Sequence, residues 1–214
     1  MNGADTMRRR GMILILSSPS GAGKTTLTRM ALQDKSLDLT LSISVTTRAR
    51  RSSEADGVHY HFISRHQFDV AKAAGDLLES AEVHGNCYGT PRAPVEAMLA
   101  GGRDMLLDID WQGAEQVRAA LGADVVSIFI LPPSMAELRA RLDRRAEDSA
   151  ATIDKRLANA KREIERWRQY DYVVVNDDLQ RAYTQVVAII GAERTRCARV
   201  AAGVEGLVER LLQG

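Results

Sequence analysis

Short apolar runs alternate with longer stretches of helical spacing along the chain. The pattern predicts strands over residues 12–16, 40–46, 77–83, 105–109, 125–131 and 172–175. It predicts helices over residues 27–33, 67–74, 91–99 and 179–194, and a long helix that Ser134 caps with Glu137 as a capping box. Buried strands that alternate with helices are typical of a parallel sheet covered on both faces. We therefore expect an α/β fold with a central parallel sheet flanked by helices.

One part of the chain breaks this rhythm. Residues 40–90 are richer in Ser, Thr, Tyr and His and more strand-like, so we interpret them as an insertion that carries substrate contacts. The core is then 12–39 and 91–196, preceded by a disordered lead-in at 1–11. The end of the chain, 197–214, has apolar spacing near 3.6, which predicts a packed helix, a self-association surface or a tail.

The composition excludes several classes of protein. The 214 residues include 29 basic and 28 acidic side chains, and this balance argues against a nucleic-acid coat or a membrane-surface protein. Cys87 and Cys197 cannot form a disulfide framework and lack zinc-site spacing, so we expect two reduced thiols. No apolar stretch is long enough to span a membrane. We expect a cytoplasmic monomer or homodimer that binds neither nucleic acid nor membrane.

A glycine-rich loop follows the first predicted strand. Its sequence, SPSGAGKT from Ser18 to Thr25, fits G-x-x-x-x-G-K-[ST] except that Ser18 replaces the first Gly. Backbone N–H groups of such a loop surround phosphates, and the following helix adds its positive end. In this pattern Lys24 reaches the β- and γ-phosphates and the Thr25 hydroxyl binds Mg²⁺. The flanking strand and helix favour a nucleoside triphosphate site over a chance glycine-rich turn.

Carboxylates end another predicted strand. Asp108 and Asp110 lie at the end of the run that begins at Met105. Two alternate carboxylates at the end of a buried strand are costly unless cations lie nearby. The pair therefore favours a magnesium site beside the phosphates, and a strand end that turns to solvent at Asp110 is the alternative.

The insertion holds side chains suited to a nucleotide. Arg48, Arg50 and Arg51 follow a run of hydroxyls, and arginine forks with tyrosine hydroxyls suit a phosphate monoester. A carboxylate such as Glu79, held in a pocket, suits guanine, because guanine offers adjacent N1–H and 2-amino donors and adenine does not. Leaving such a carboxylate unpaired is costly, so discrimination could reach roughly 10⁴-fold. Alone, the arginines also fit a solvated face, and Glu79 an exposed strand end.

Several spaced segments together resemble the guanylate kinases, of the nucleoside monophosphate kinase group. The resemblance runs from about Met12 to Ala192, and its segments are SPSGAGKTT, SVTTRARR-x-x-E-x-D-G-x-x-Y-x-F, the Glu79 strand, GNCYGT, LLDIDWQG, LPPS and VVVNDD. It implies phosphoryl transfer from ATP with Mg²⁺ to GMP or dGMP, giving ADP and GDP. It also implies that residues 139–160 form a mobile lid.

The resemblance assigns roles to individual residues. ATP binds at Ser18, Pro19, Ser20, Gly21, Ala22, Gly23, Lys24, Thr25 and Thr26, with Asn176 at the adenine. The GMP phosphate contacts Arg48, Arg51, Tyr60 and Tyr88, and guanine contacts Ser44, Glu79 and Thr90. Asp108 and Asp110 lie near the nucleotides and, with Thr25, Asp108 lies at the metal. Lys24 and the lid residues Arg141, Arg145 and Arg156 spread the charge of the transferring group.

Two other functions remain as alternatives. A related domain can bind phosphorylated peptides without catalysis, but such a module can dispense with the loop lysine and the lid arginines, which this chain retains. A small kinase for a sugar phosphate would keep the phosphate loop without the complete guanine set. Arg139 and Arg144 are expected to be an exposed, ion-paired helix face only.

Overall fold

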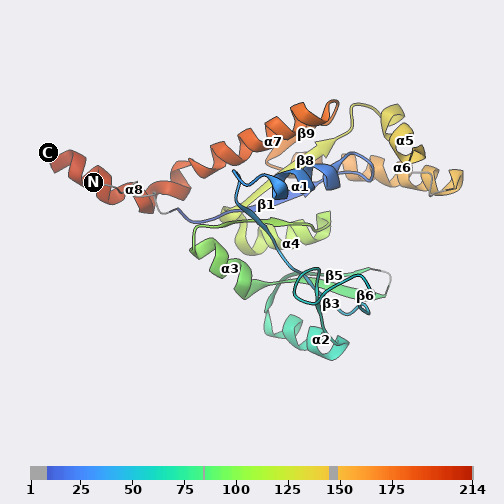
Figure 1. Cartoon of the computed structure of the whole chain (residues 1–214), viewed down its shortest axis with the longest axis horizontal. Coiled ribbons are helices and arrows are strands. Elements are labelled where there is room, and N and C mark those ends of the chain that lie inside the picture. Colours follow the sequence, from blue (N-terminus) through green and yellow to red (C-terminus); the bar gives the residue numbers. More distant parts are fainter. Residues whose placement is uncertain (1–8, 84, 145–148, 214) are drawn as a thin grey trace. The chain divides into compact units, whose positions relative to one another are not determined.

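The computed structural model describes residues 9–83, 85–144 and 149–213 (Figure 1). Over these residues, one sheet has the strand order β2-β7-β1-β8-β9 and a second has the order β4-β3-β6-β5. The chain forms two compact units, one containing Leu14–Leu39 and Val126–Gly214 and the other containing Arg10–Ile13 and Thr40–Val125. We describe each unit by itself.

The first unit surrounds strands that are almost entirely apolar. Its elements are β1 (Ile13–Ser17), α1 (Lys24–Gln33), β8 (Val125–Leu131), α5 (Met135–Asp143), α6 (Ala150–Ile164), β9 (Tyr172–Val175), α7 (Leu179–Arg194) and α8 (Cys197–Gln213). Every residue of β1 is buried, which fits a strand covered on both faces. Strands β8 and β9 pair in parallel, from Ile128 opposite Tyr172 to Leu131 opposite Val175.

Helices of the first unit pack through separate contacts. Helices α1 and α7 lie against each other, and the Tyr183 hydroxyl donates a hydrogen bond to Asp34 Oδ2 over 2.7 Å. Leu138 and Leu142 of α5 pack with Ile153 and Leu157 of α6 in one apolar cluster. The face of α5 that carries these leucines is therefore fixed, and the remaining face is left for polar side chains.

The second unit combines a small mixed sheet, in which β3 and β4 are parallel and the other pairs antiparallel, with three helices. Its elements are β2 (Leu39–Leu41), β3 (Val45–Thr46), β4 (His61–Phe62), α2 (Arg65–Ala74), β5 (Leu77–Val83), β6 (Asn86–Pro91), α3 (Arg92–Ala100), β7 (Asp104–Leu107) and α4 (Trp111–Leu121). Strands β5 and β6 form an antiparallel hairpin in which Glu79 lies opposite Thr90. This register places the Glu79 carboxylate beside the Thr90 hydroxyl.

The predicted fold class is confirmed, and so are several elements. Strands 77–83, 125–131 and 172–175 and helix 179–194 have the predicted bounds. The end of the chain, for which the sequence left a helix or a tail open, forms helix α8. None of the helices in the described residues combines the length and apolar character that a bilayer span needs.

The single strand predicted over residues 40–46 is wrong. The chain forms β2 and then β3, which belong to different sheets. The reason lies in the hydrogen bonds on either side of Ile43. The Ser42 N–H donates to the Leu106 carbonyl, whereas the Ser44 carbonyl accepts from the His61 N–H. The chain therefore passes from one sheet to the other in the middle of an unbroken alternating pattern.

The strand predicted over residues 105–109 ends early, at Leu107. Asp110 is instead the N-cap of α4, and its Oδ1 accepts a hydrogen bond from the Gly113 N–H over 2.9 Å. Helix α4, helix α6 and strand β6 are elements that the apolar pattern did not predict.

Candidate active site

The phosphate loop has the backbone that its glycines permit. Strand β1 ends at Ser17 and α1 begins at Lys24, so the loop joins a buried strand directly to a helix N-terminus. Gly21 and Gly23 have φ values of 92° and 106°, in the left-handed region that other residues rarely adopt. Gly23 is also confined by space, because a Cβ added to it would lie 2.2 Å from Asn176 Nδ2.

The start of α1 is suited to an anion. No side chain caps this helix and its first turn holds no acidic residue, so its N-terminal dipole is not neutralised locally. The Ser17 hydroxyl, at the start of the loop, is buried and has no hydrogen-bond partner in the described part of the chain. Backbone donors and a positive helix end together can bind phosphate groups.

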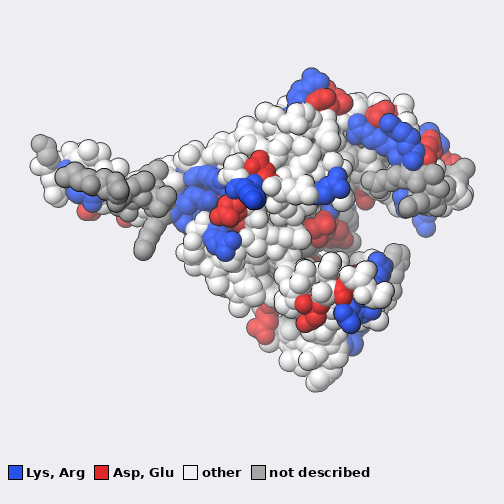
Figure 2. Space-filling view, in the orientation of Figure 1, with Lys and Arg blue, Asp and Glu red and all other residues white. Residues whose placement is uncertain are grey.

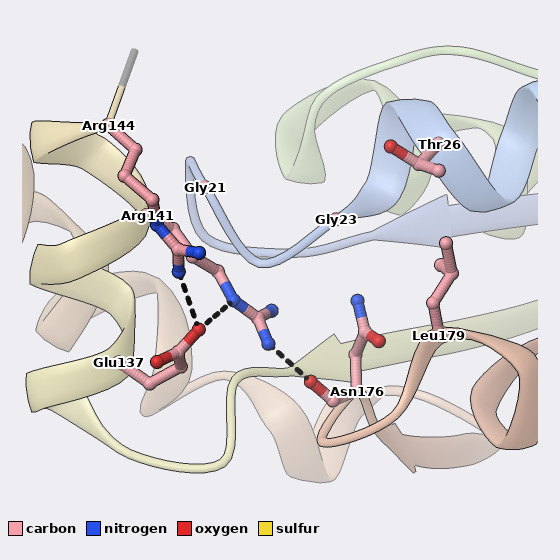
Figure 3. Close-up of a pocket in the computed structure, with 8 residues that line it drawn as sticks. All are labelled: Gly21, Gly23, Thr26, Glu137, Arg141, Arg144, Asn176 and Leu179. Carbon is pink, nitrogen blue, oxygen red and sulfur yellow. Dashed lines mark hydrogen bonds and ion pairs between the residues drawn. The ribbon is translucent and has the colours of Figure 1, made fainter. Parts of the chain in front are cut away.

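A cavity of about 400 Å³ adjoins the loop (Figure 3). Its lining residues are Gly21, Gly23, Thr26, Glu137, Arg141, Arg144, Asn176 and Leu179. Five of the predicted site residues, Gly21, Gly23, Thr26, Arg141 and Asn176, therefore meet around one space. Arg156 lies on α6 and does not line this cavity, and Arg145 lies outside the described residues.

Arg141 is held in place by three groups. Its Nε donates to Glu137 Oε1 over 2.9 Å and its Nη2 donates to the Asn176 carbonyl over 3.0 Å. Its Nη1 lies 3.5 Å from the Ala22 carbonyl of the phosphate loop. A guanidinium fixed at the edge of the cavity is available to an anion inside it without a large loss of side-chain entropy.

Glu137 has a different role from the predicted capping box. The Ser134 hydroxyl does accept a hydrogen bond from the Glu137 N–H, so Ser134 is the N-cap. The Glu137 carboxylate, however, bonds to Arg141 and Arg144 in place of the helix backbone. The Arg141 hydrogen bond is the main reason that the pKa of Glu137 is lowered.

The two arginines expected to be surface residues differ from each other. Arg139 is exposed and forms an ion pair with Asp154 at 2.5 Å, as predicted. Arg144 lines the cavity in addition to its contact with Glu137, so it is more than an exposed helix residue. Figure 2 shows basic side chains gathered over α5 with acidic side chains beside them, which explains how a cationic region fits a chain of nearly zero net charge.

The second unit has its own cavity, of about 280 Å³. Its lining residues are Ser44, Tyr60, Glu79, Ala81, Val83, Tyr88, Asp108, Ile109 and Asp110. Six predicted site residues, from four separate stretches of sequence, therefore surround one space. Arg48, Arg51 and Thr90 do not line it, although Thr90 contacts Glu79 directly.

Glu79 is a buried carboxylate, only 5% exposed. Burial raises its pKa, and the nearby negative charge of Asp110 adds to the rise. The Thr90 hydroxyl donates to Glu79 Oε1 over 2.7 Å, and this hydrogen bond acts to lower the Glu79 pKa. A Cβ on Gly113 would lie 3.0 Å from Glu79 Oε2, so the backbone of α4 approaches this carboxylate closely. The interpretation of Glu79 as an exposed strand end is wrong, because this residue is buried and lines the cavity.

Arg48 lies between aromatic rings and a carboxylate. Its guanidinium lies 5.5 Å from the Tyr60 ring centre and 5.9 Å from that of Phe62. The Tyr60 and Tyr88 rings meet edge to face at 6.0 Å. These contacts fix the direction of a cation beside two tyrosines of the cavity.

Glu54 is a residue that we did not assign to the site from sequence. Its Oε1 accepts from Arg48 Nη2 over 2.7 Å and its Oε2 accepts from the Arg51 N–H over 2.8 Å. The Arg48 hydrogen bond is the main reason that the pKa of Glu54 is lowered to about 2. Glu54 is a fixed position of the segment that resembles the guanylate kinases, but no role was assigned to it, and the folded loop shows its contacts.

The described residues contain no group of three His, Cys, Asp or Glu side chains able to hold a metal ion without other ligands. This is compatible with Mg²⁺, which keeps several waters and commonly binds through one or two carboxylates plus substrate phosphates. Thr25, in the first unit, and Asp108, in the second unit, are both exposed.

Comparisons with known proteins identify the family of the chain. The family model for guanylate kinase matches residues 10–193. A guanylate kinase from Chelativorans sp. (strain BNC1) is 60% identical over 207 residues, covering 97% of this chain and 94% of the relative. Another from Agrobacterium fabrum (strain C58 / ATCC 33970) is 60% identical over 195 residues, covering 91% and 88%. A crystal structure of guanylate kinase from Anaplasma phagocytophilum matches with a TM-score of 0.73 and 39% identity, covering 94% of this chain and 95% of that chain. The chain belongs to the guanylate kinase family.

Proposed function

We propose that the protein transfers the γ-phosphoryl group of ATP to GMP or dGMP and releases ADP and GDP. The observation that carries the choice of GMP is the buried Glu79 carboxylate, which lines the cavity and is hydrogen-bonded to Thr90. A phosphate loop alone would fit many nucleotide-binding proteins. A buried acceptor selects a base with adjacent N–H donors, and guanine is such a base.

ATP binds through the phosphate loop in this proposal. Residues 18–26 surround the phosphates, all but Pro19 having a backbone N–H group, and Lys24 neutralises charge on the β- and γ-phosphates. Arg141 supports the transferring group from the cavity edge, since it is already fixed by Glu137 and the Asn176 carbonyl. Arg145 and Arg156 of the proposed lid at 139–160 are assigned the same task.

Mg²⁺ is assigned to Thr25 and Asp108. When bound, the ion neutralises the developing charge on the phosphates. The hydroxyl of Thr25 and the carboxylate of Asp108 are hard oxygen ligands, which fit this ion better than nitrogen or sulfur would.

The acceptor nucleotide binds in the second unit. Arg48, Arg51, Tyr60 and Tyr88 are assigned to the GMP phosphate, because arginine forks and tyrosine hydroxyls suit a phosphate monoester. Guanine is assigned to Ser44, Glu79 and Thr90, with Asp108 and Asp110 beside the nucleotide. The protein needs no nucleophile of its own, since positioning and charge neutralisation supply most of phosphoryl-transfer catalysis.

The organisation that accompanies this function is also a proposal. The core is 12–39 and 91–196, the GMP-binding insertion is 40–90, and closure of the lid excludes water that would otherwise hydrolyse ATP. A cytoplasmic location fits the two cysteines, Cys87 and Cys197, which are free thiols. No observation favours a phosphopeptide-binding module or a sugar-phosphate kinase.

The proposal is tested with a nucleotide panel coupled to ADP release. Purified protein with ATP and Mg²⁺ is expected to phosphorylate GMP and dGMP but not AMP, CMP or UMP. Turnover of AMP equal to that of GMP would refute the assignment of the base to Glu79.

A further inference from the structure

Asn176 is anchored at the end of a central strand. It follows β9 directly and is only 4% exposed. Its backbone N–H donates to the Leu131 carbonyl over 2.8 Å, which continues the hydrogen bonding between β8 and β9. The backbone of Asn176 is therefore as fixed as the strand that precedes it.

The side chain and carbonyl of Asn176 contact two parts of the candidate active site. Asn176 Nδ2 donates to the Ala22 carbonyl of the phosphate loop over 2.8 Å, in a buried hydrogen bond. The Asn176 carbonyl accepts from Arg141 Nη2 over 3.0 Å, a contact drawn in Figure 3. One residue at a strand end thus connects the phosphate loop to an arginine on α5.

Close packing supports the same connection. A Cβ on Gly23 would lie 2.2 Å from Asn176 Nδ2, so the loop backbone passes directly against the amide. Gly23 also has a positive φ, and a side chain there would be strained. The glycine is therefore required both by the loop conformation and by the position of Asn176.

We infer that Asn176 is a positioning residue that fixes the phosphate loop through the Ala22 carbonyl and holds Arg141 beside it. This inference rests on the proposed function. The Asn176 amide gives the carbonyl of the buried Ala22 a hydrogen-bond partner, and loss of such a partner is costly for a buried group. The role differs from a contact with the adenine base, because it serves the phosphates and is independent of the base.

The test uses Asn176→Ala, which removes the N–H donor to the Ala22 carbonyl without adding a charge near the phosphates. Affinities for ADP and for inorganic tripolyphosphate, which has no base, are measured by calorimetry. We expect both to weaken by the same factor, roughly 10- to 100-fold. The matched control is Asp177→Asn, a neighbouring exposed residue, which is expected to leave both affinities unchanged.

Three further readouts keep the result decisive. GMP affinity, which depends on the second unit, is expected to be unchanged in Asn176→Ala, whereas a general loss of structure would lower it as well. Asn176→Ser, with its thermal unfolding curve, replaces the Ala variant if that variant does not fold. Steady-state rates are expected to show a lower kcat with an unchanged KM for GMP.

Tripolyphosphate affinity that is unchanged while ADP affinity falls would overturn the inference and assign Asn176 to the adenine. Unchanged affinity for both ligands would overturn it as well. If the unmodified protein does not phosphorylate GMP, the proposed function fails, but the tripolyphosphate measurement still decides the role of Asn176 in the loop.

Discussion

The phosphate-loop region and the Glu79 region are built from different parts of the polypeptide. The loop depends on backbone conformation, through two glycines with positive φ and a helix N-terminus without a side-chain cap. The Glu79 cavity depends on side chains from four separate stretches of sequence, among them a buried carboxylate and two tyrosines. The first arrangement suits any polyphosphate, whereas the second can distinguish one base from another.

This difference separates charge neutralisation from base selection. Changes in the loop region are expected to affect transfer to every acceptor, because every acceptor uses the same donor phosphates. Changes in the Glu79 region are expected to affect the choice and the affinity of the acceptor. The following substitutions, from the largest expected effect to the smallest, test whether the two regions behave in this way.

Lys24→Ala is expected to have the largest effect. Loss of one preorganised charge-stabilising group at a reaction centre costs about 10²- to 10³-fold in kcat. Lys24 is only half-buried at the start of α1, so thermal unfolding is expected to change little. Initial rates with saturating GMP measure the effect, and near-normal turnover in a folded variant would refute the charge-neutralising role.

Glu79→Gln is expected to lower kcat/KM for GMP by roughly 10²-fold while ATP affinity is unchanged. The amide keeps the shape of the side chain but replaces one acceptor oxygen with a donor, which leaves guanine donors unpaired. The change is measured as kcat/KM for GMP and, separately, as ADP affinity. A loss of ADP affinity equal to the loss for GMP would contradict the separation of the two regions.

Glu54→Gln is expected to raise KM for GMP about tenfold with little change in kcat. Its carboxylate aligns Arg48 and the Arg51 backbone, and hydrogen bonds to charged groups are among the stronger ones. The matched control is Asp69→Asn, which removes an exposed ion pair with Arg65 in the same unit. Equal effects of the two substitutions would show that Glu54 does not position Arg48.

The pH dependence of GMP binding is expected to show the smallest effect. Guanine needs the ionised form of Glu79, and the pKa of this group is raised by burial. As the pH falls, affinity for GMP is therefore lost at a higher pH than the ordinary glutamate value of 4.5. Glu54 does not contribute to this loss, because its pKa is lowered to about 2 and it stays ionised.

Calorimetric titration of GMP between pH 4 and pH 8 measures this dependence, with Glu79→Gln as the control. The GMP phosphate itself gains a proton at about pH 6 in both proteins, so the contribution of Glu79 is the ratio of wild-type to control affinity at each pH. A ratio that falls only below the ordinary glutamate value would contradict the raised pKa.

The sequence predicted the loop region better than the insertion, for a physical reason. The strand, the glycines and the helix that form the phosphate loop are adjacent in sequence, so local spacing is sufficient. The turn of the chain at Ile43, from one sheet to another, depends on the distant partners Leu106 and His61. The alternating pattern around it gives no sign of the change.

The sequence also did not predict which partners some carboxylates bind. A carboxylate that bonds to arginine in place of the backbone, as Glu137 does, keeps the sequence signature of a capping box. Asp110 extends an apolar run in sequence but caps α4 in the structure. The sequence shows which polar groups are present. Their hydrogen-bond partners depend on the folded structure, so the sequence does not show them.

The ratio of kcat/KM for GMP to that for AMP, measured on the unmodified protein with ATP and Mg²⁺, tests the central claim most directly. Adenine would leave the buried Glu79 carboxylate without hydrogen-bond donors, so we expect a ratio on the order of 10⁴. A ratio near one would contradict the claim that the second unit selects guanine.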